Sequence, residues 1–228
     1  MNEFSRTESL IGADNLNKIK NSKVLVIGLG GVGSSAVETL VRSGVENIIL
    51  VDYDKVDITN INRQLIALHS TIGKYKTDVM ESRIKDINPN CNVIKINKKI
   101  DSSNIDELFN YDIDYIVDAC DTVETKKLLI KISHDKNIDI ISSMGTAKKL
   151  DPTKLYITDI RKTSYDKLAK VLRKWVIDEK INYKVMVVSS TEEVIKIEDN
   201  ILASMSFVPN TAGILCAKYV IGKILSKN

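Results

Sequence analysis

Residues 23–33 read KVLVIGLGGVG, an apolar run followed at once by closely spaced glycines. A short run rich in Val and Ile is typical of a strand buried in a parallel sheet. Gly28, Gly30 and Gly33 fit the spacing G-x-G-x-x-G, which allows a tight turn, close approach of a phosphate and close packing of the next helix. The start of that helix offers N–H groups and a positive dipole end to an anion. The stretch predicts a nucleotide-binding turn, although glycines used only for packing would give the same pattern.

Strands and helices alternate through the next hundred residues. Apolar runs typical of buried strands are found at residues 47–52, 91–96, 115–119 and 138–142. Helical patterns are found at residues 34–43, 76–88, 103–109 and 123–136. This alternation predicts an α/β fold, a Rossmann-like doubly wound sheet that is mostly parallel.

The pattern changes after Gly145. Residues 154–160 alternate like a strand with one wet face, residues 165–179 form a basic helix, and residues 184–189 form another strand. We expect this elaborated C-terminal third to be partly antiparallel and to end in a helix over about 211–225. Because no repeat or Pro-rich linker is found, we predict a single domain over 1–228. Its nucleotide-binding core covers about 20–145, and its substrate- and RNA-binding elaboration covers about 146–228.

Composition limits the class of protein. The 228 residues are 43% hydrophobic and 28% charged, which argues against disorder. A net charge of +3 means that any nucleic-acid surface must be local. Cys91, Cys120 and Cys216 form no C-x-x-C pair, which excludes a four-cysteine zinc site and favours a reducing, cytoplasmic setting. The first twenty residues lack a signal-peptide core, and the interrupted apolar stretch 201–225 favours a buried strand and helix over a membrane span.

Polar residues beyond the glycines bear on the choice of nucleotide. Asp52 ends the second strand, where a carboxylate binds the ribose of NAD or of any adenosine nucleotide. Amides, cations and carboxylates that suit a triphosphate and Mg²⁺ follow at Asp54, Asn60, Arg63, Gln64, Lys76 and Asp121. A dehydrogenase has no use for several cations at this point, so the pattern favours ATP. His69 and His134 have no acid or metal partner in sequence, and we interpret both as structural or surface residues.

These motifs together resemble the ubiquitin-activating-enzyme-like adenylyltransferase family. The shared order is G-x-G-G-x-G, D-x-D-x-V, N-x-x-R-Q, G-x-x-K and D-x-x-D, and the similarity runs from Arg6 to about Gly145. The resemblance implies one ATP-binding domain whose ligands to the nucleotide are Gly28, Gly30, Gly31, Gly33, Asp52, Asp54, Asn60, Arg63, Gln64 and Lys76. It also implies that Asp121 holds Mg²⁺. Arg6 and Arg63 are then candidates to reach ATP in a neighbouring subunit, which implies a homodimer.

Family members activate a carboxylate by attack on the α-phosphorus of ATP, so Arg6, Arg63, Lys76 and Asp121 are the implied catalytic residues. Such a transfer depends on positioning and on charge stabilisation by cations and Mg²⁺. Cys120 lies beside Asp121, and we interpret it as a small, half-buried residue and not as a thioester nucleophile.

The last third resembles the branch of the family that acts on tRNA. The segments that carry this resemblance are SSMG (142–145), LDPTK (150–154), TDIRKT (158–163), DKLAKVLRK (166–174), VVSSTE (187–192) and SFVP (206–209). Members of that branch use ATP to cyclise threonylcarbamoyladenosine beside the anticodon, with net loss of water and no carrier thiol. The resemblance therefore implies tRNA as the substrate. A sulfur-transfer protein is a further candidate partner. A sulfur-carrier adenylyltransferase stays an alternative, as does an NAD-binding Rossmann protein or scaffold.

The distribution of charge supports an RNA surface independently. Residues 161–184 hold eight basic and three acidic residues, a net charge of +5. The RNA-binding candidates are Arg161, Lys162, Lys167, Lys170, Arg173 and Lys174. Three of the lysines repeat at i, i+3 and i+7, one stripe of a helix, which suits phosphates but would equally suit a solvated face. Trp175 is expected in the core in preference to a base-stacking position.

Overall fold

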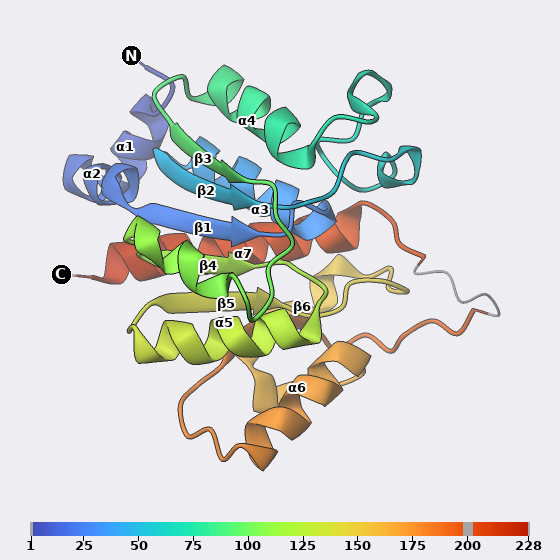
Figure 1. The fold of residues 1–228 in the computed structure, drawn as a ribbon. Coiled ribbons are helices and arrows are strands. Elements are labelled where there is room, and N and C mark those ends of the chain that lie inside the picture. The colour runs from blue at the N-terminus through green and yellow to red at the C-terminus, as the bar shows by residue number, and fades with distance from the viewer. Residues whose placement is uncertain (1, 198–202, 228) are drawn as a thin grey trace.

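One seven-stranded sheet organises the chain, in the order β3-β2-β1-β4-β5-β7-β6 (Figure 1). The computed structural model describes residues 2–197 and 203–227. The strands are β1 Lys23–Ile27, β2 Asn47–Val51, β3 Asn92–Ile96, β4 Tyr115–Asp118, β5 Asp139–Ser143, β6 Leu155–Asp159 and β7 Met186–Ser190. All neighbours pair in parallel except β6, which runs antiparallel to β7. The predicted α/β fold with a partly antiparallel C-terminal third is confirmed.

Helices cover both faces of this sheet. The α-helices are α1 Ser5–Ile11, α2 Ala13–Asn21, α3 Gly31–Arg42, α4 Lys76–Ile87, α5 Val123–Asp135, α6 Lys167–Asp178 and α7 Phe207–Ser226. Short 3-10 turns are η1 Ile58–Asn60, η2 His69–Thr71, η3 Ile105–Tyr111, η4 Pro152–Lys154 and η5 Ile160–Lys162. In Figure 1, α5 and α6 lie in front of the sheet, and α3 and α7 lie behind it.

The two faces bury separate apolar cores. The rear core joins β-strand residues such as Val26 and Val117 to α3, α4 and α7. The front core joins Ile27 and Ile116 to α5 and η3, and a neighbouring cluster packs α6 against β7. Strand residues alternate between these cores because successive side chains of a strand point to opposite faces. The alternation puts Asp118 of β4 on the front face, two residues after Ile116.

The close contact between α3 and α7 depends on a glycine. A Cβ atom on Gly213 of α7 would lie 2.2 Å from the carbonyl oxygen of Val32. Gly31 meets α7 in a similar way, because its Cβ would lie 3.0 Å from Pro209. The last helix therefore supports the start of α3 directly.

Several expected boundaries are corrected by the structure. The last helix begins at Phe207 and not near residue 211, because Pro209 lies in the first turn, where no N–H group is needed. The basic helix begins at Lys167, since Tyr165 has φ +52° and the Asp166 side chain caps Ala169 N. The short helix expected over 103–109 is a 3-10 helix over Ile105–Tyr111.

The expected strand before the last helix is not found in residues 203–206, and residues 198–202 lie outside the described part. Residues 5–21 form two helices, α1 and α2, which are separated by Gly12. Among the described residues, no helix is both long and apolar enough to cross a membrane.

Candidate functional site

A polar cleft of about 330 Å³ opens where β1, β2 and β4 end. The carboxyl ends of parallel strands are the usual ligand site of a doubly wound sheet. The cleft is lined by backbone of the glycine turn and by the side chains of Asp52, Tyr53, Asp54, Asn60, Arg63, Gln64, Lys76, Lys98, Lys99, Cys120, Asp121, Thr122 and Thr125. The structure therefore gathers every sequence-predicted nucleotide ligand except Gly33 and Arg6 in the lining of one cavity.

The glycines of the turn serve two purposes: some allow close packing, and one leaves the cleft open to a ligand. Gly28 has φ +86°, and a Cβ there would lie 2.7 Å from Ala119 O. A Cβ on Gly33 would lie 1.7 Å from Gly28 O, so Gly33 serves packing. Gly30 is different, because its Cβ would come no closer than 3.9 Å to another group. The absence of a side chain at Gly30 keeps the cleft beside the start of α3 open, as a phosphate site requires.

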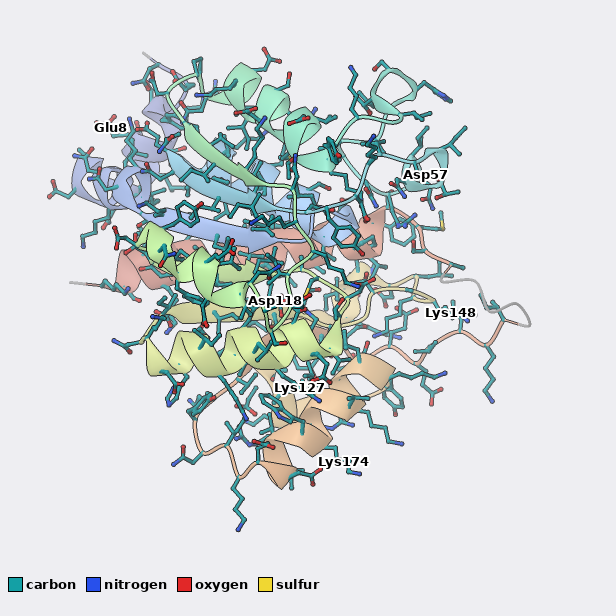
Figure 2. The ribbon with its side chains drawn as sticks, in the orientation of Figure 1. Glu8, Asp57, Asp118, Lys127, Lys148 and Lys174 are labelled. Carbon is teal, nitrogen blue, oxygen red and sulfur yellow. The ribbon has the colours of Figure 1, made fainter. Side chains whose placement is uncertain are left out.

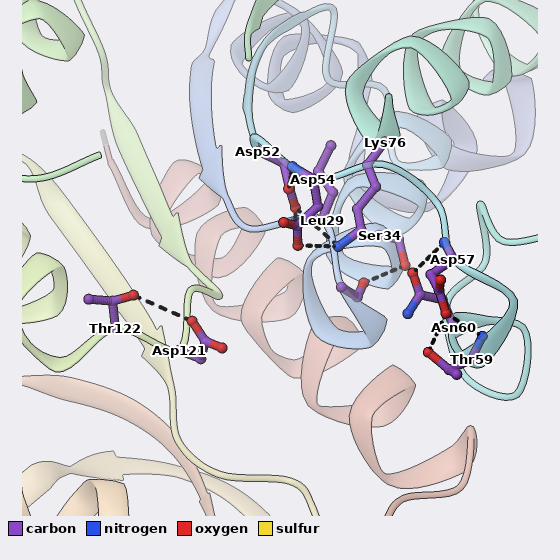
Figure 3. A network of polar contacts seen from close by, with 11 residues as sticks. Leu29, Ser34, Asp52, Asp54, Asp57, Thr59, Asn60, Lys76, Asp121 and Thr122 are labelled. Atoms are coloured by element: carbon purple, nitrogen blue, oxygen red, sulfur yellow. Dashed lines mark hydrogen bonds and ion pairs between the residues drawn. The ribbon is translucent and has the colours of Figure 1, made fainter. Parts of the chain in front are cut away.

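Asp52, Asp54 and Lys76 form the charged centre of the cleft (Figure 3). Asp52 follows β2 and accepts hydrogen bonds from Leu29 N at 2.6 Å and Asp54 N at 2.8 Å. The Nζ atom of Lys76, the first residue of α4, lies 2.8 Å from Asp54 Oδ2 and 3.9 Å from Asp52 Oδ2. Burial raises the pKa of Asp52 above its ordinary value, and Lys76 and the two amides only partly oppose this. The centre joins the glycine turn, β2 and α4 through direct contacts.

The η1 loop carries the amide and guanidinium candidates. Asn60 Oδ1 accepts a hydrogen bond from Asp57 N at 3.0 Å, which closes the turn on itself. Arg63 Nη1 lies 2.8 Å from Thr59 O, so its guanidinium rests on its own loop at the edge of the cleft. Gln64 is buried, and its Oε1 atom has no hydrogen-bond partner among the described residues. That oxygen is available to a donor from a bound molecule or water.

Asp121 is the exposed carboxylate of the turn after β4. Its Oδ1 atom accepts one long hydrogen bond, from Thr122 Oγ1 at 3.4 Å, and Figure 3 shows the pair across the cleft from Lys76. In the described part of the chain, no group of three or more His, Cys, Asp or Glu is placed so that it could hold a metal ion. A cation at Asp121 would therefore need oxygens from phosphate and water for its remaining ligands. That donor set fits Mg²⁺, which usually binds through one or two carboxylates and the phosphates of its substrate.

Cys120 has a structural contact and no sign of an activated thiol. Its Sγ atom lies 3.0 Å from Asp118 Oδ1. Burial, with the Asp118 carboxylate, raises the pKa of the Cys120 thiol far above its ordinary value. A nucleophilic cysteine needs a lowered pKa, so these contacts support the prediction that Cys120 forms no thioester.

Other predicted residues lie away from the cleft. Arg6 is exposed on α1, which Figure 1 places at the opposite end of β1 from the glycine turn. Within one chain the structure does not bring Arg6 to the other candidates. His69 is exposed, and His134 stacks on Tyr183 with ring centroids 3.5 Å apart, in keeping with the structural interpretation.

The six RNA-binding candidates divide into two groups. Arg161 is held by Asp159 and by Tyr183 O at 3.1 Å, and Arg173 donates to Thr163 O and Thr163 Oγ1 at 2.5 and 2.7 Å. These two guanidinium groups tie local segments together. The exposed lysines are Lys162, Lys167, Lys170 and Lys174. Figure 2 shows Lys174 on α6 at the surface. Trp175 is half-buried, with Lys131 Nζ 5.6 Å from its ring centroid.

The sequence patterns missed Lys98 and Lys99, which line the cleft from the segment after β3. Only their position in the sequence could have identified them. Residues that directly follow a parallel strand of this sheet lie at the edge where the cleft opens. Lys98 pairs with Glu107 at 3.0 Å. Lys99 adds a second lysine of this segment to the cleft lining.

Fold and cleft together define a nucleotide-binding α/β protein of the Rossmann type. The sequence profile of the ThiF family matches residues 4–224, and the chain belongs to the ThiF family. It is 43% identical to the tRNA threonylcarbamoyladenosine dehydratase of Bacillus subtilis, over 99% of this chain and 95% of that relative. The molybdopterin-synthase adenylyltransferase of Haemophilus influenzae is 29% identical over 72% of this chain and 67% of that relative.

Solved structures agree with the sequence relatives. The crystal structure of Escherichia coli tRNA N6-threonylcarbamoyladenosine dehydratase in complex with ATP superposes with a TM-score of 0.91. The two proteins are 32% identical, over 98% of this chain and 94% of that chain. The similarity therefore covers the C-terminal third as well as the nucleotide-binding core.

Proposed function

We propose that this chain uses ATP to dehydrate threonylcarbamoyladenosine in tRNA. The observation that carries the proposal is the full-length similarity to dehydratases of that name, C-terminal third included. The cleft adds an independent argument. It combines a glycine turn, a buried carboxylate, a cation and an exposed carboxylate at one sheet edge, which is what an ATP-dependent transfer needs.

The chemistry follows from the substrate. Its carboxylate attacks the α-phosphorus of ATP, an acyl–adenylate forms, and pyrophosphate leaves. A nucleophile within the same modified nucleoside then attacks the activated carbonyl, a ring closes, and AMP leaves with the oxygen of the original carboxylate. The net change in the nucleoside is loss of water, and no carrier thiol is required. The raised pKa of Cys120 is consistent with this route.

Each predicted ligand has a task in this scheme. Asp52 accepts the ribose hydroxyls through carboxylate lone pairs that Leu29 N and Asp54 N leave unused. Lys76 exchanges its contact with Asp54 for the phosphates, and the start of α3 receives them as well. Asn60 and Arg63 contact the phosphates from η1. Asp121 would hold Mg²⁺, which would supply charge neutralisation for the triphosphate.

The tRNA is expected on α6. Lys167, Lys170 and Lys174 are exposed on this amphipathic helix, whose apolar face packs through Leu172 and Val176. Lys162 extends the basic surface. We leave Arg161 and Arg173 out of the RNA surface, because their guanidinium groups already bind protein carbonyls.

We infer a homodimer in which Arg6 or Arg63 reaches the cleft of the partner subunit. Arg6 lies too far from its own cleft to serve it, and Arg63 lies at the cleft edge on an exposed loop. We place the reaction in the cytoplasm, in keeping with three unpaired cysteines.

The direct test is conversion of tRNA that carries threonylcarbamoyladenosine. The tRNA is incubated with the protein, ATP and Mg²⁺, and its nucleosides are separated and weighed by mass spectrometry. We expect a nucleoside lighter by one water, with AMP and pyrophosphate in equal amounts. Asp121→Asn, a change at an exposed side chain, is the control that should fold and not react. Unchanged nucleosides with the unmodified protein would contradict the proposal.

The same preparation decides between the alternatives. ATP–pyrophosphate exchange stimulated by a carrier protein ending in Gly-Gly, and not by tRNA, would favour a sulfur-carrier adenylyltransferase. Tight binding of NAD in calorimetry, without binding of ATP, would favour a dehydrogenase or scaffold.

A further inference from the structure

A buried ion pair lies directly behind the turn that carries Asp121. Lys126 of α5 and Asp118 at the end of β4 both have 0% exposed side chains, and Lys126 Nζ lies 3.0 Å from Asp118 Oδ2. Figure 2 labels Asp118 near α5. Two charges removed this completely from water gain little stability over an apolar pair.

The second carboxylate oxygen of Asp118 holds the next residues of the chain. Its Oδ1 atom lies 3.2 Å from Cys120 N and 3.0 Å from Cys120 Sγ, and both groups donate to it. Lys126 Nζ also lies 3.5 Å from the Asp118 carbonyl oxygen. The Asp118 carboxylate thus holds the turn 119–122, and the Lys126 ammonium group holds the Asp118 carboxylate.

The turn has two duties in the cleft. Ala119 N donates to Ile27 O at 2.8 Å, and a Cβ on Gly28 would meet Ala119 O at 2.7 Å, so the turn bounds the glycine loop. Asp121, two residues further on, faces the cleft with only the long contact from Thr122. A small rotation of this turn would therefore have two effects at once: it would move the Asp121 carboxylate, and it would change the width of the cleft.

We propose that Lys126 and Asp118 are a positioning pair that fixes the turn 119–122 and aims the Asp121 carboxylate at a cation bound with ATP. Neither residue touches the nucleotide in this arrangement. The inference rests on the proposed function, because it takes Asp121 as a ligand of Mg²⁺. It goes further, because it proposes that the position of the Asp121 carboxylate depends on the buried pair of Lys126 and Asp118.

The test separates positioning from plain stability with three variants. Lys126→Met leaves the buried Asp118 carboxylate without its cation and should lower both melting temperature and turnover. The double variant Asp118→Leu, Lys126→Met removes both charges and should melt near the unmodified protein, because an apolar pair replaces a buried ion pair at little cost. Lys127→Met is the matched control, since Lys127 is the next residue of α5 and pairs with Glu124 at the surface.

The double variant distinguishes a positioning role from a purely stabilising one. We expect its turnover to fall about 100-fold, as for a reacting group displaced by about 1 Å. The Mg²⁺ concentration that half-saturates ATP binding should rise about tenfold, as for loss of a group that orients a metal ligand. Lys127→Met should change neither quantity. A well-folded double variant with normal turnover and normal Mg²⁺ dependence would overturn the proposal.

A third measurement does not depend on catalysis. Cys120 is partly exposed, whereas Cys91 and Cys216 have 0% exposed side chains, so a thiol reagent reports on the turn. Labelling of Cys120, located by peptide mass spectrometry, should be faster in the double variant than in Lys127→Met. If the unmodified protein fails to convert tRNA, labelling and Mg²⁺-dependent ATP binding still decide this proposal. Equal labelling in the two variants would show that the pair does not hold the turn.

Discussion

Arg83 of α4 binds the Glu38 carboxylate of α3, with Nη2 3.0 Å from Oε1 and Nε on the second oxygen. This pair joins the helix that begins at the glycine turn to the helix that begins with Lys76. Arg42 reaches the same carboxylate at 2.7 Å. The distance between two walls of the cleft therefore depends on one carboxylate that lies outside it.

Replacing Glu38 with Gln should destabilise the fold in a pH-dependent way. Burial alone would raise the pKa of Glu38, but the hydrogen bonds from Arg83 and Arg42 lower it below the ordinary 4.5. A lowered folded-state pKa gives stability that is present above the ordinary pKa and lost as pH falls through the folded value. We expect a loss of about 1 kcal/mol at neutral pH, or about 2–4 °C in melting temperature.

Thermal melts of Glu38→Gln and the unmodified protein from pH 7 down to pH 3 test this expectation. The difference between the two should shrink below pH 4.5, where the Glu38 carboxylate takes up its proton. Glu8→Gln, at an exposed site on α1, is the control. A difference that stays constant across this range would mean that the ionised carboxylate is not what stabilises the helix pair.

Lys76→Gln should block turnover while the fold persists. The change keeps a hydrogen-bond donor and removes the positive charge next to Asp52 and Asp54. We expect turnover to fall by about 10²–10³, the usual effect of removing one group that stabilises developing charge. Lys74→Gln, two residues earlier and exposed, is the matched control. ATP titration and AMP release measure both variants, and near-normal turnover in Lys76→Gln would remove Lys76 from the site.

The sequence was a reliable guide where burial decides structure. Strands β1, β2, β4 and β5 are short apolar runs buried on both faces, and these runs have few alternatives to a parallel sheet. The glycine turn was equally predictable, because its steric demands fall on Gly28 and Gly33 themselves. Asp52, Asp54 and Lys76 meet because the end of β2 and the start of α4 converge on one edge of the sheet.

The features that could not be predicted from the sequence depend on contacts between distant residues and on local caps. Arg161 and Arg173 looked like parts of a basic surface, yet carbonyl groups at Ile181, Tyr183 and Thr163 take their donors. Backbone carbonyl partners of this kind cannot be recognised from the order of side chains in a sequence. Lys126 was hidden for the same reason, since its partner Asp118 lies on a strand and the pairing depends on how α5 packs across it.

Mixing two inactive variants should test whether Arg63 acts across a dimer. Arg63→Ala and Lys76→Ala chains are co-expressed with different tags and purified together. If Arg63 serves the partner's site, each mixed dimer isolated through both tags holds one intact site of its two, and roughly half of normal activity should return. If Arg63 serves its own chain, every site in every dimer lacks one residue and activity stays absent. Light scattering that finds a monomer at working concentration would refute the shared site.

The lysine stripe on α6 is expected to bind the phosphates of tRNA. Replacing Lys167, Lys170 and Lys174 together with Gln should weaken tRNA binding and reduce the slope of log affinity against log salt by roughly two to three units, because each phosphate contact releases counterions. ATP affinity should hardly change, since exposed charges beyond a Debye length of about 8 Å are screened. The matched control replaces three exposed lysines on other elements, Lys18, Lys136 and Lys218. Filter binding across a salt series measures all three proteins. If both triple variants lose the same slope, the net charge of the chain drives binding, and α6 has no special part in holding the tRNA.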